Sequence, residues 1–169
     1  VEGLTAVDLL RRAGVSVTMV SIMGRTKITG ARNISVNTDI LIEDIKEEAD
    51  MLVLPGGMPG TKYLGEYQPL CDLLRDFYGK GGKVAAICAA PTVLASLGFL
   101  EGRKATAYPS CMVGLTGAEP SYESVVVDGN VTTSRGLGTA VDFALSLIGQ
   151  LLGEEKADEI AESVVYSRK

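Results

Sequence analysis

The chain has 169 residues, of which 46% are apolar and 22% are charged, and its formal net charge at neutral pH is −5. This length and balance fit a globular fold that needs neither disulfides nor a metal for its core, so we expect residues 1–169 to form a single domain. The acidic charge without a basic cluster argues against nucleic acid and anionic membranes as partners, and no apolar run is long enough to span a membrane.

The counts of histidine and cysteine limit the chemistry further. The sequence has no histidine, which excludes Ser-His-Asp catalysis, Cys-His catalysis and histidine-based metal sites within it. Its three cysteines, Cys71, Cys88 and Cys111, are an odd number without the spacing of a disulfide framework or a zinc site. We therefore expect no metal and a reducing, cytoplasmic compartment.

In chain order, the sequence predicts strands that alternate with helices. Apolar, β-branched runs indicate the strands, and periodic apolar positions bounded by Gly or Pro indicate the helices. The predicted elements are a helix over 4–12, a strand over 15–22, a hairpin or bent strand over 27–36, a strand over 51–54, a helix over 68–78, a strand over 83–87, a helix over 91–97, a short strand over 104–107, a hairpin with strands over 125–127 and 131–133, and helices over 139–152 and 154–165. This order predicts a three-layer α/β sandwich with a mostly parallel sheet.

Two segments follow predicted strands at the sheet edge where such folds bind ligands. The first is LPGGMPG, in which Gly56 and Gly57 let backbone N–H groups approach a ligand closely. A simple turn is the other interpretation of this glycine pair. The second is AAICAAP, which leads from the strand at 83–87 through Cys88 into a helix. Together, the two segments favour an anion pocket over two unrelated turns.

Cys88 is the candidate nucleophile or redox-active thiol. Small residues on both sides of it permit a tight strand-to-helix turn, and a thiol at a helix N-terminus is favoured as the thiolate. The N–H groups of such a turn can also hold an oxyanion. Position alone does not separate this interpretation from that of a small buried cysteine. Of the other cysteines, Cys71 is expected in the core, and Cys111 is expected to be structural rather than a resolving thiol.

The segments LPGGMPG, AAICAAPTVLASLG and TTSRGLGTAVDFAL, taken as a set, resemble the ThiJ/PfpI superfamily, in the DJ-one-like branch of the parkinsonism-associated protein deglycase. The resemblance runs from residue 1 to about residue 153. It implies a flavodoxin-like sandwich and a homodimer. It also implies a first strand ahead of the helix at 4–12, which is apparently missing from this chain.

The resemblance implies a catalytic pair and an oxyanion site. Cys88 matches the family's oxidation-sensitive nucleophile, and Glu2 matches the glutamic acid that donates a hydrogen bond to its sulfur. Gly57 and Ala89 match the residues whose backbone amides face the reacting oxygen, with Gly56 beside them. Since two negative groups do not both ionise cheaply in a half-buried pocket, we expect a coupled pair in which Glu2 keeps the proton beside a Cys88 thiolate.

The resemblance also implies secondary positions and two departures from the family pattern. Arg32 and Arg135 match positions near the site and the dimer contact, although by themselves they are ordinary surface charges. Tyr108 stands where many members of the branch have a histidine. Ala89 stands where the peptidase-like branch has a histidine, which argues against a protease or amidase.

The function implied is that of a cysteine-dependent, cofactor-independent glyoxalase or deglycase. Cys88 would add to the aldehyde of a small reactive 2-oxoaldehyde, or of its adduct, and Glu2 would move a proton between adjacent carbons to give a 2-hydroxy acid. Two alternatives remain open. Cys88 could be the switch of a non-enzymatic redox sensor or redox-regulated chaperone, or a purely structural residue.

Overall fold

The computed structural model of the chain describes residues 1–168, and its helices and strands alternate as the sequence predicts. The α-helices are α1 (Glu2–Arg12), α2 (Gly60–Glu66), α3 (Gln68–Gly79), α4 (Pro91–Ser96), α5 (Ala140–Leu152) and α6 (Glu154–Ser163). The 3₁₀ helices are η1 (Ile42–Asp44), η2 (Pro109–Gly114) and η3 (Leu137–Thr139). The strands are β1 (Val20–Ser21), β2 (Lys27–Thr29), β3 (Ser35–Asn37), β4 (Ile40–Leu41), β5 (Met51–Leu54), β6 (Lys83–Ile87), β7 (Lys104–Ala105), β8 (Glu119–Pro120), β9 (Val125–Asp128) and β10 (Val131–Ser134).

The central sheet has the strand order β5-β6-β10-β9. β5, β6 and β10 run parallel, and β9 is antiparallel to β10. Asp128 pairs with Val131, so the β9–β10 hairpin closes through Gly129 and Asn130, the two-residue turn that the Asp-Gly-Asn segment predicts. The pairs β1–β4, β2–β3 and β7–β8 form separate two-stranded sheets.

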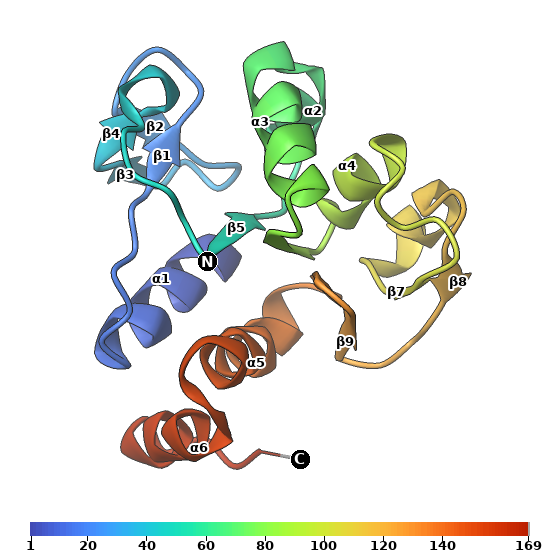
Figure 1. The fold of residues 1–169 in the computed structure, drawn as a ribbon. Helices are drawn as coiled ribbons and strands as arrows, with labels where there is room; N and C mark the ends of the chain where they lie inside the picture. The colour runs from blue at the N-terminus through green and yellow to red at the C-terminus, as the bar shows by residue number, and fades with distance from the viewer. Residues whose placement is uncertain (169) are drawn as a thin grey trace.

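Helices cover both faces of the central sheet, which confirms the flavodoxin-like three-layer sandwich. In Figure 1, α1, α5 and α6 lie on one side of the central strands, and α2, α3 and α4 lie on the other. The side chains of β6 alternate between the two layers. Ala85 and Ile87 lie in the core formed with α1, α5 and α6, whereas Val84 and Ala86 lie in the core formed with α3 and α4. A strand buried on both faces is apolar throughout, and this is why β6 was evident from the sequence.

The parallel register brings three loop segments to one edge of the sheet. Leu54 of β5 lies opposite Ala86 of β6, and Ser134 of β10 lies opposite Ile87. The chain therefore leaves β5, β6 and β10 at the same edge, where a doubly covered sheet forms its binding sites. This is the edge at which the sequence predicts a pocket.

Some predicted boundaries are wrong. Only Val20–Ser21 of the strand predicted over 15–22 forms a ladder, which it makes with β4. Alternate residues of 15–19 are half-buried, but a strand also needs a neighbour to pair with, and the period-two pattern reports only burial. The strand at 104–107 ends at Ala105, the helix at 91–97 ends at Ser96, and the helix at 154–165 ends at Ser163.

Helix α2 is the one α-helix of the described residues that the sequence reading missed. It is short and contains glycine at positions 60 and 65, which lowers helix propensity and hides the pattern. The first helix begins at Glu2 rather than at residue 4. The strand that the family resemblance implies ahead of this helix stays a prediction.

Candidate active site at Cys88

Cys88 occupies a strained turn between β6 and α4. Its φ is +65°, in the left-handed region that residues with a Cβ seldom adopt. Neighbouring segments hold this conformation from both sides. The Cys88 N–H donates to the Ser134 carbonyl at 2.9 Å, and the Cys88 carbonyl accepts from the Tyr108 N–H at 2.8 Å. The turn thus has the backbone of a nucleophile elbow, as the small residues around Cys88 predict.

The Cys88 sulfur lies among groups from four separate segments. The N–H groups of Gly57 and Ala89 face it, and the Glu2 side chain shares a hydrogen bond with it. Gly136 closes a further side: a Cβ added there would lie 3.8 Å from Sγ, 3.9 Å from Glu2 Oε1 and 3.5 Å from Tyr108 Cδ2. The structure therefore brings Cys88, Glu2, Gly57, Ala89 and Tyr108 together, although the chain separates them widely.

Helix α1 carries Glu2 to the thiol. The helix is amphipathic, and Ala6, Leu9 and Leu10 are buried in the core that includes α5. Gly3 permits the first turn to approach the loop after β5, since a Cβ there would lie 3.1 Å from Pro55 Cβ. Because α1 packs on the core and Gly3 permits its close approach, the helix places Glu2 at the sheet edge. By its sequence position alone, Glu2 would be expected in solvent.

Burial and a neighbouring acid dominate the electrostatics of the thiol. Burial raises the pKa of Cys88 from its ordinary value of 9.0, and the charge and hydrogen bond of Glu2 raise it further. The N–H groups of Ala89 and Gly57 lower the pKa, and the balance is about 11. This differs from the resting thiolate expected from the sequence. The two backbone amides do not outweigh desolvation and the charge of Glu2, so the pKa of the Cys88 thiol lies above its ordinary value.

Gly56 and three threonines shape the loops around the thiol. A Cβ on Gly56 would overlap Cys88 Cβ and the Ile87 carbonyl, so this glycine allows two loops to touch. Gly56 therefore has a packing role, and its grouping with the amide donors stays a prediction. Each threonine hydroxyl donates to a carbonyl of its own loop: Thr61 to Gly57 at 3.0 Å, Thr92 to Ala89 at 2.7 Å and Thr139 to Gly136 at 3.0 Å.

The two arginines predicted near the site have different surroundings. Arg135 directly precedes Gly136, its Nη1 donates to the Tyr122 carbonyl at 3.4 Å, and its Nε is buried without a hydrogen-bond partner among the described residues. Arg32 is exposed in the loop of the β2–β3 hairpin. This hairpin lies on the far side of β5 from α4 in Figure 1. The role of Arg32 near the site or the dimer contact stays a prediction.

The other two cysteines lie in structural surroundings. Cys71 is buried in α3, and its Sγ lies 3.5 Å from the Gly65 carbonyl oxygen, which confirms the core prediction. Cys111 is half-buried in η2 and packs against the core of α3 and α4. All three cysteines are free thiols.

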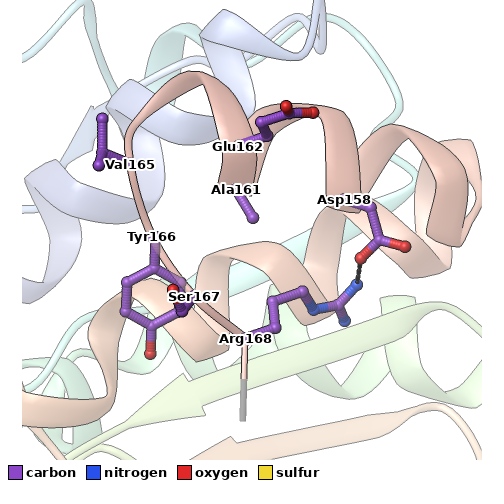
Figure 2. Close-up of a pocket in the computed structure, with 7 residues that line it drawn as sticks. All are labelled: Asp158, Ala161, Glu162, Val165, Tyr166, Ser167 and Arg168. Carbon is purple, nitrogen blue, oxygen red and sulfur yellow. Dashed lines mark hydrogen bonds and ion pairs between the residues drawn. The ribbon is translucent and has the colours of Figure 1, made fainter.

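A cavity elsewhere on the molecule does not compete with this site. It measures about 370 Å³ and lies at the C-terminal turn (Figure 2). Arg168 in this cavity is neutralised by Asp158 at 2.6 Å and by Glu154 at 2.9 Å, so it offers no free charge to an anion. Within residues 1–168, no group of three or more Cys, Asp or Glu side chains could hold a metal ion. No helix in that part of the chain is long and apolar enough to cross a membrane.

Sequence reasoning missed one residue of the cluster, Gly136. The signal was present, because Ser134-Arg135-Gly136-Leu137-Gly138 follows a strand in the same way that LPGG follows β5. A glycine-containing segment at this third strand end is thus the sequence signal for Gly136. The threonine hydroxyls that donate to carbonyls of these loops carry no sequence pattern and are visible only in the structure.

Comparison with known proteins places this geometry in a family. Residues 1–150 match the DJ-1/PfpI family. The protein dj-1beta of Drosophila melanogaster is 41% identical over 98% of this chain and 90% of its own length. The glutathione-independent glyoxalase DJR-1.2 of Caenorhabditis elegans is 30% identical over 99% of this chain and 90% of its own. The solved structure of oxidised Toxoplasma gondii DJ-1 is 35% identical and superposes with a TM-score of 0.95 over 99% of this chain and 92% of that one. This chain belongs to the DJ-1/PfpI family.

Proposed function

We propose that this protein is a cysteine-dependent, cofactor-independent enzyme of glyoxalase or deglycase type that acts on 2-oxoaldehydes or their adducts. One observation carries the proposal: the Cys88 sulfur faces two backbone N–H groups and one carboxyl group at a strained strand-end turn. A nucleophile, two oxyanion donors and an acid–base group suffice for addition to an aldehyde. The name of the Caenorhabditis elegans relative supports the same chemistry.

The first step forms a hemithioacetal. Glu2 takes the proton of the Cys88 thiol as sulfur attacks the aldehyde carbon. The S–C bond forms, and the carbonyl π pair moves onto the oxygen, where the amides of Gly57 and Ala89 stabilise it by about 3 kcal/mol per good donor. Glu2 then returns the proton to this oxygen. The raised pKa of Cys88 fits this sequence, because the thiolate is needed only during attack.

The second step moves hydrogen between adjacent carbons. The Glu2 carboxylate removes the proton from the former aldehyde carbon, which gives an enediolate with its negative charge on the former ketone oxygen. Glu2 then returns this proton to the neighbouring carbon, and the hydroxyl proton of the former aldehyde carbon passes to the former ketone oxygen. The aldehyde carbon is thereby oxidised and the ketone carbon reduced, so no external oxidant is required. The product is a thioester, which water cleaves to the 2-hydroxy acid while sulfur regains its proton.

The test is the conversion of methylglyoxal to lactate by the wild type and by Cys88→Ser. Several turnovers per chain in the wild type, lost in Cys88→Ser, are expected. Equal lactate formation by the two proteins would overturn the proposal. Cys71→Ser is the matched control, because its thiol is buried in α3 away from the sheet edge.

A redox sensor is the second candidate. Its specific support is that the Gly57 and Ala89 amides would equally hold oxygens on a sulfenic or sulfinic Cys88. The Toxoplasma gondii structure is also that of an oxidised DJ-1. Mass spectrometry after peroxide treatment distinguishes the candidates. Stoichiometric oxidation of Cys88 without any turnover of 2-oxoaldehydes would favour the sensor.

We further propose that the protein is a cytoplasmic homodimer, as the family resemblance implies. An apolar groove of about 520 Å³ along α1 supports an interface there, and Leu4 is an exposed member of it. Light scattering should give twice the mass of the chain, and Leu4→Glu should give the monomer. Leu152→Glu, at a similarly exposed leucine of α5, is the control. A monomeric wild type would contradict this proposal.

A further inference from the structure

We infer that Tyr108 is a further catalytic residue, whose phenol hydroxyl donates a hydrogen bond to the ketone oxygen of the 2-oxoaldehyde and carries a proton between the two substrate oxygens in the second step. This inference rests on the proposed function, since it concerns the same site. The second step leaves one need open, because negative charge develops on the former ketone oxygen, and neither Glu2 nor the amides of Gly57 and Ala89 are assigned to that oxygen.

Backbone hydrogen bonds fix Tyr108 beside the turn that carries the thiol. Its N–H donates to the Cys88 carbonyl at 2.8 Å, and its own carbonyl accepts from the Cys111 N–H at 2.7 Å. A Cβ placed on Gly136 would lie 3.5 Å from Tyr108 Cδ2. The same point lies 3.8 Å from Cys88 Sγ and 3.9 Å from Glu2 Oε1. The ring, the sulfur and the carboxyl group therefore surround one point, close to where a ketone oxygen joined to the sulfur through two carbon atoms would lie.

The phenol of Tyr108 is available to a substrate. The hydroxyls of Tyr78 and Tyr166 donate to protein oxygens at 3.3 Å and 2.7 Å, whereas within residues 1–168 the Tyr108 hydroxyl makes no hydrogen bond to the protein. Tyr108 is 49% exposed, so a substrate that enters from solvent can contact it. Thr106 Oγ1 and Arg135 Nε also lack a partner in that part of the chain, but both atoms are buried. The exposed phenol is therefore the best placed of these three groups.

A phenol hydroxyl is a donor and an acceptor at once, and the second step needs both. When Glu2 removes the proton from the former aldehyde carbon, the hydrogen bond from Tyr108 stabilises the negative charge that develops on the former ketone oxygen. After Glu2 has protonated the neighbouring carbon, Tyr108 gives its proton to the former ketone oxygen and takes the hydroxyl proton of the former aldehyde carbon. One O–H bond breaks as another forms at each transfer, so Tyr108 ends as it began and no other reactant is consumed.

Tyr108→Phe tests the inference, because it removes the hydroxyl and keeps the ring. The kcat for methylglyoxal should fall by about a hundredfold, since a donor to the developing oxyanion is lost. The rate at which iodoacetamide alkylates Cys88 should stay that of the wild type, because the thiol keeps its surroundings. Tyr63→Phe, at a tyrosine of α2 that is 44% exposed, is the control and should keep the wild-type kcat. An unchanged kcat in Tyr108→Phe, or a changed alkylation rate, would overturn the inference.

A binding assay separates this inference from the proposed function. In a Glu2→Gln background the second step lacks its acid–base group, so methylglyoxal and propanal both stop at the hemithioacetal, and their protection of Cys88 against iodoacetamide measures its stability. Propanal has no ketone oxygen and is the matched control. Adding Tyr108→Phe should weaken the protection by methylglyoxal about fivefold, through the loss of one hydrogen bond, and should leave the protection by propanal unchanged.

The two assays together distinguish the outcomes. If the wild type forms no lactate but Tyr108→Phe selectively weakens protection by methylglyoxal, the proposed function is overturned and Tyr108 is supported as the donor to the ketone oxygen. If the wild type forms lactate and Tyr108→Phe changes neither kcat nor protection, the role of Tyr108 is overturned and the proposed function stands.

Discussion

Cys71 and Cys88 show how two turns of the same fold give a thiol opposite surroundings. Cys71 is 4% exposed within α3, and its sulfur lies near the carbonyl oxygens of Leu64 and Gly65, which accept hydrogen bonds. Cys88 is partly exposed at a strand end, and its sulfur faces the N–H groups of Gly57 and Ala89, which donate them. Backbone carbonyls accept a hydrogen bond from the S–H group and so favour the thiol. Backbone N–H groups stabilise negative charge on sulfur or on an oxygen bound to it.

The comparison shows what separates a structural cysteine from a candidate nucleophile: whether backbone acceptors or backbone donors face its sulfur. Donors are free at Cys88 because the chain leaves β5 and β6 at one sheet edge, with the glycine of one loop pressed against the turn of the other. Carbonyls surround Cys71 because it packs against the end of the preceding helix, α2. Four predictions test this difference, taken in order of decreasing effect.

The largest effect is expected from removing the exposed thiol. Cys88→Ser should lower the kcat/KM for methylglyoxal by about 10⁴-fold or more, because a hydroxyl is a much weaker nucleophile without a histidine base. Cys71→Ser should leave kcat/KM within a few-fold of the wild type. Lactate formation measures both. A comparable loss in the two variants would show that the polarity of the surroundings does not distinguish the cysteines.

The next effect is expected at the acid beside the thiol. Glu2→Gln should lower kcat/KM by about a hundredfold, because the acid–base group is lost. The same change should lower the pKa of Cys88 from about 11, because the negative charge is removed while the Gly57 and Ala89 amides remain. The pH dependence of iodoacetamide labelling measures this pKa. Glu43→Gln, at an exposed acid in η1, is the control, and an unshifted profile in Glu2→Gln would disprove the coupling.

A third effect concerns the glycine of each turn. Gly56→Ala should lower the free energy of unfolding by about 1–3 kcal/mol, because its Cβ would overlap Cys88 Cβ and the Ile87 carbonyl. Gly65→Ala, beside Cys71, should be neutral or stabilising, because its Cβ would lie 3.6 Å from Val93 Cγ2 and alanine favours the helix. Urea denaturation measures both variants. Equal stability of the two would contradict the close contact at Cys88.

The smallest effect is a pH dependence of stability. The folded protein keeps the Cys88 proton up to a pKa of about 11, whereas the unfolded chain releases it near 9.0. The stabilisation from this retained proton is therefore present below pH 9 and is lost as the pH rises towards 11. The wild type should lose more free energy of unfolding over this window than Cys88→Ala does. Parallel slopes for wild type and Cys88→Ala would contradict the raised pKa.

The fold could be predicted where burial and backbone pairing follow the same pattern. β5 and β6 were found to the residue, because short apolar runs end at glycine or cysteine turns. The residues before β1 show the alternation of a strand, but their pairing depends on a neighbour that local sequence does not contain. Helix α2 does not stand out in the sequence because it has only seven residues and contains Gly60 and Gly65, which lower helix propensity.

The candidate site could be predicted in part. Cys88 and the amide-bearing loops follow from strand ends and small residues, whereas Glu2 was singled out only through the family resemblance, since an acid at the start of a helix has no local signal. A thiolate is expected from the amide donors and the helix end, whereas burial and the charge of Glu2 raise the pKa of Cys88. The balance of these effects depends on how deeply the turn is buried, and burial of a single atom cannot be deduced from residue types.

The position of Glu2 on α1 has a consequence for local unfolding. The acid that raises the pKa of Cys88 is carried by a helix that packs through one face, which is held to the core through Ala6, Leu9 and Leu10. A helix packed through one face opens at lower free energy than a strand that is buried on both faces, such as β6. Each opening of α1 withdraws the carboxylate and leaves the thiol beside its amide donors, so Cys88 gains thiolate character when the chain starts to unfold. Opening of α1 and activation of the Cys88 sulfur therefore occur in the same event.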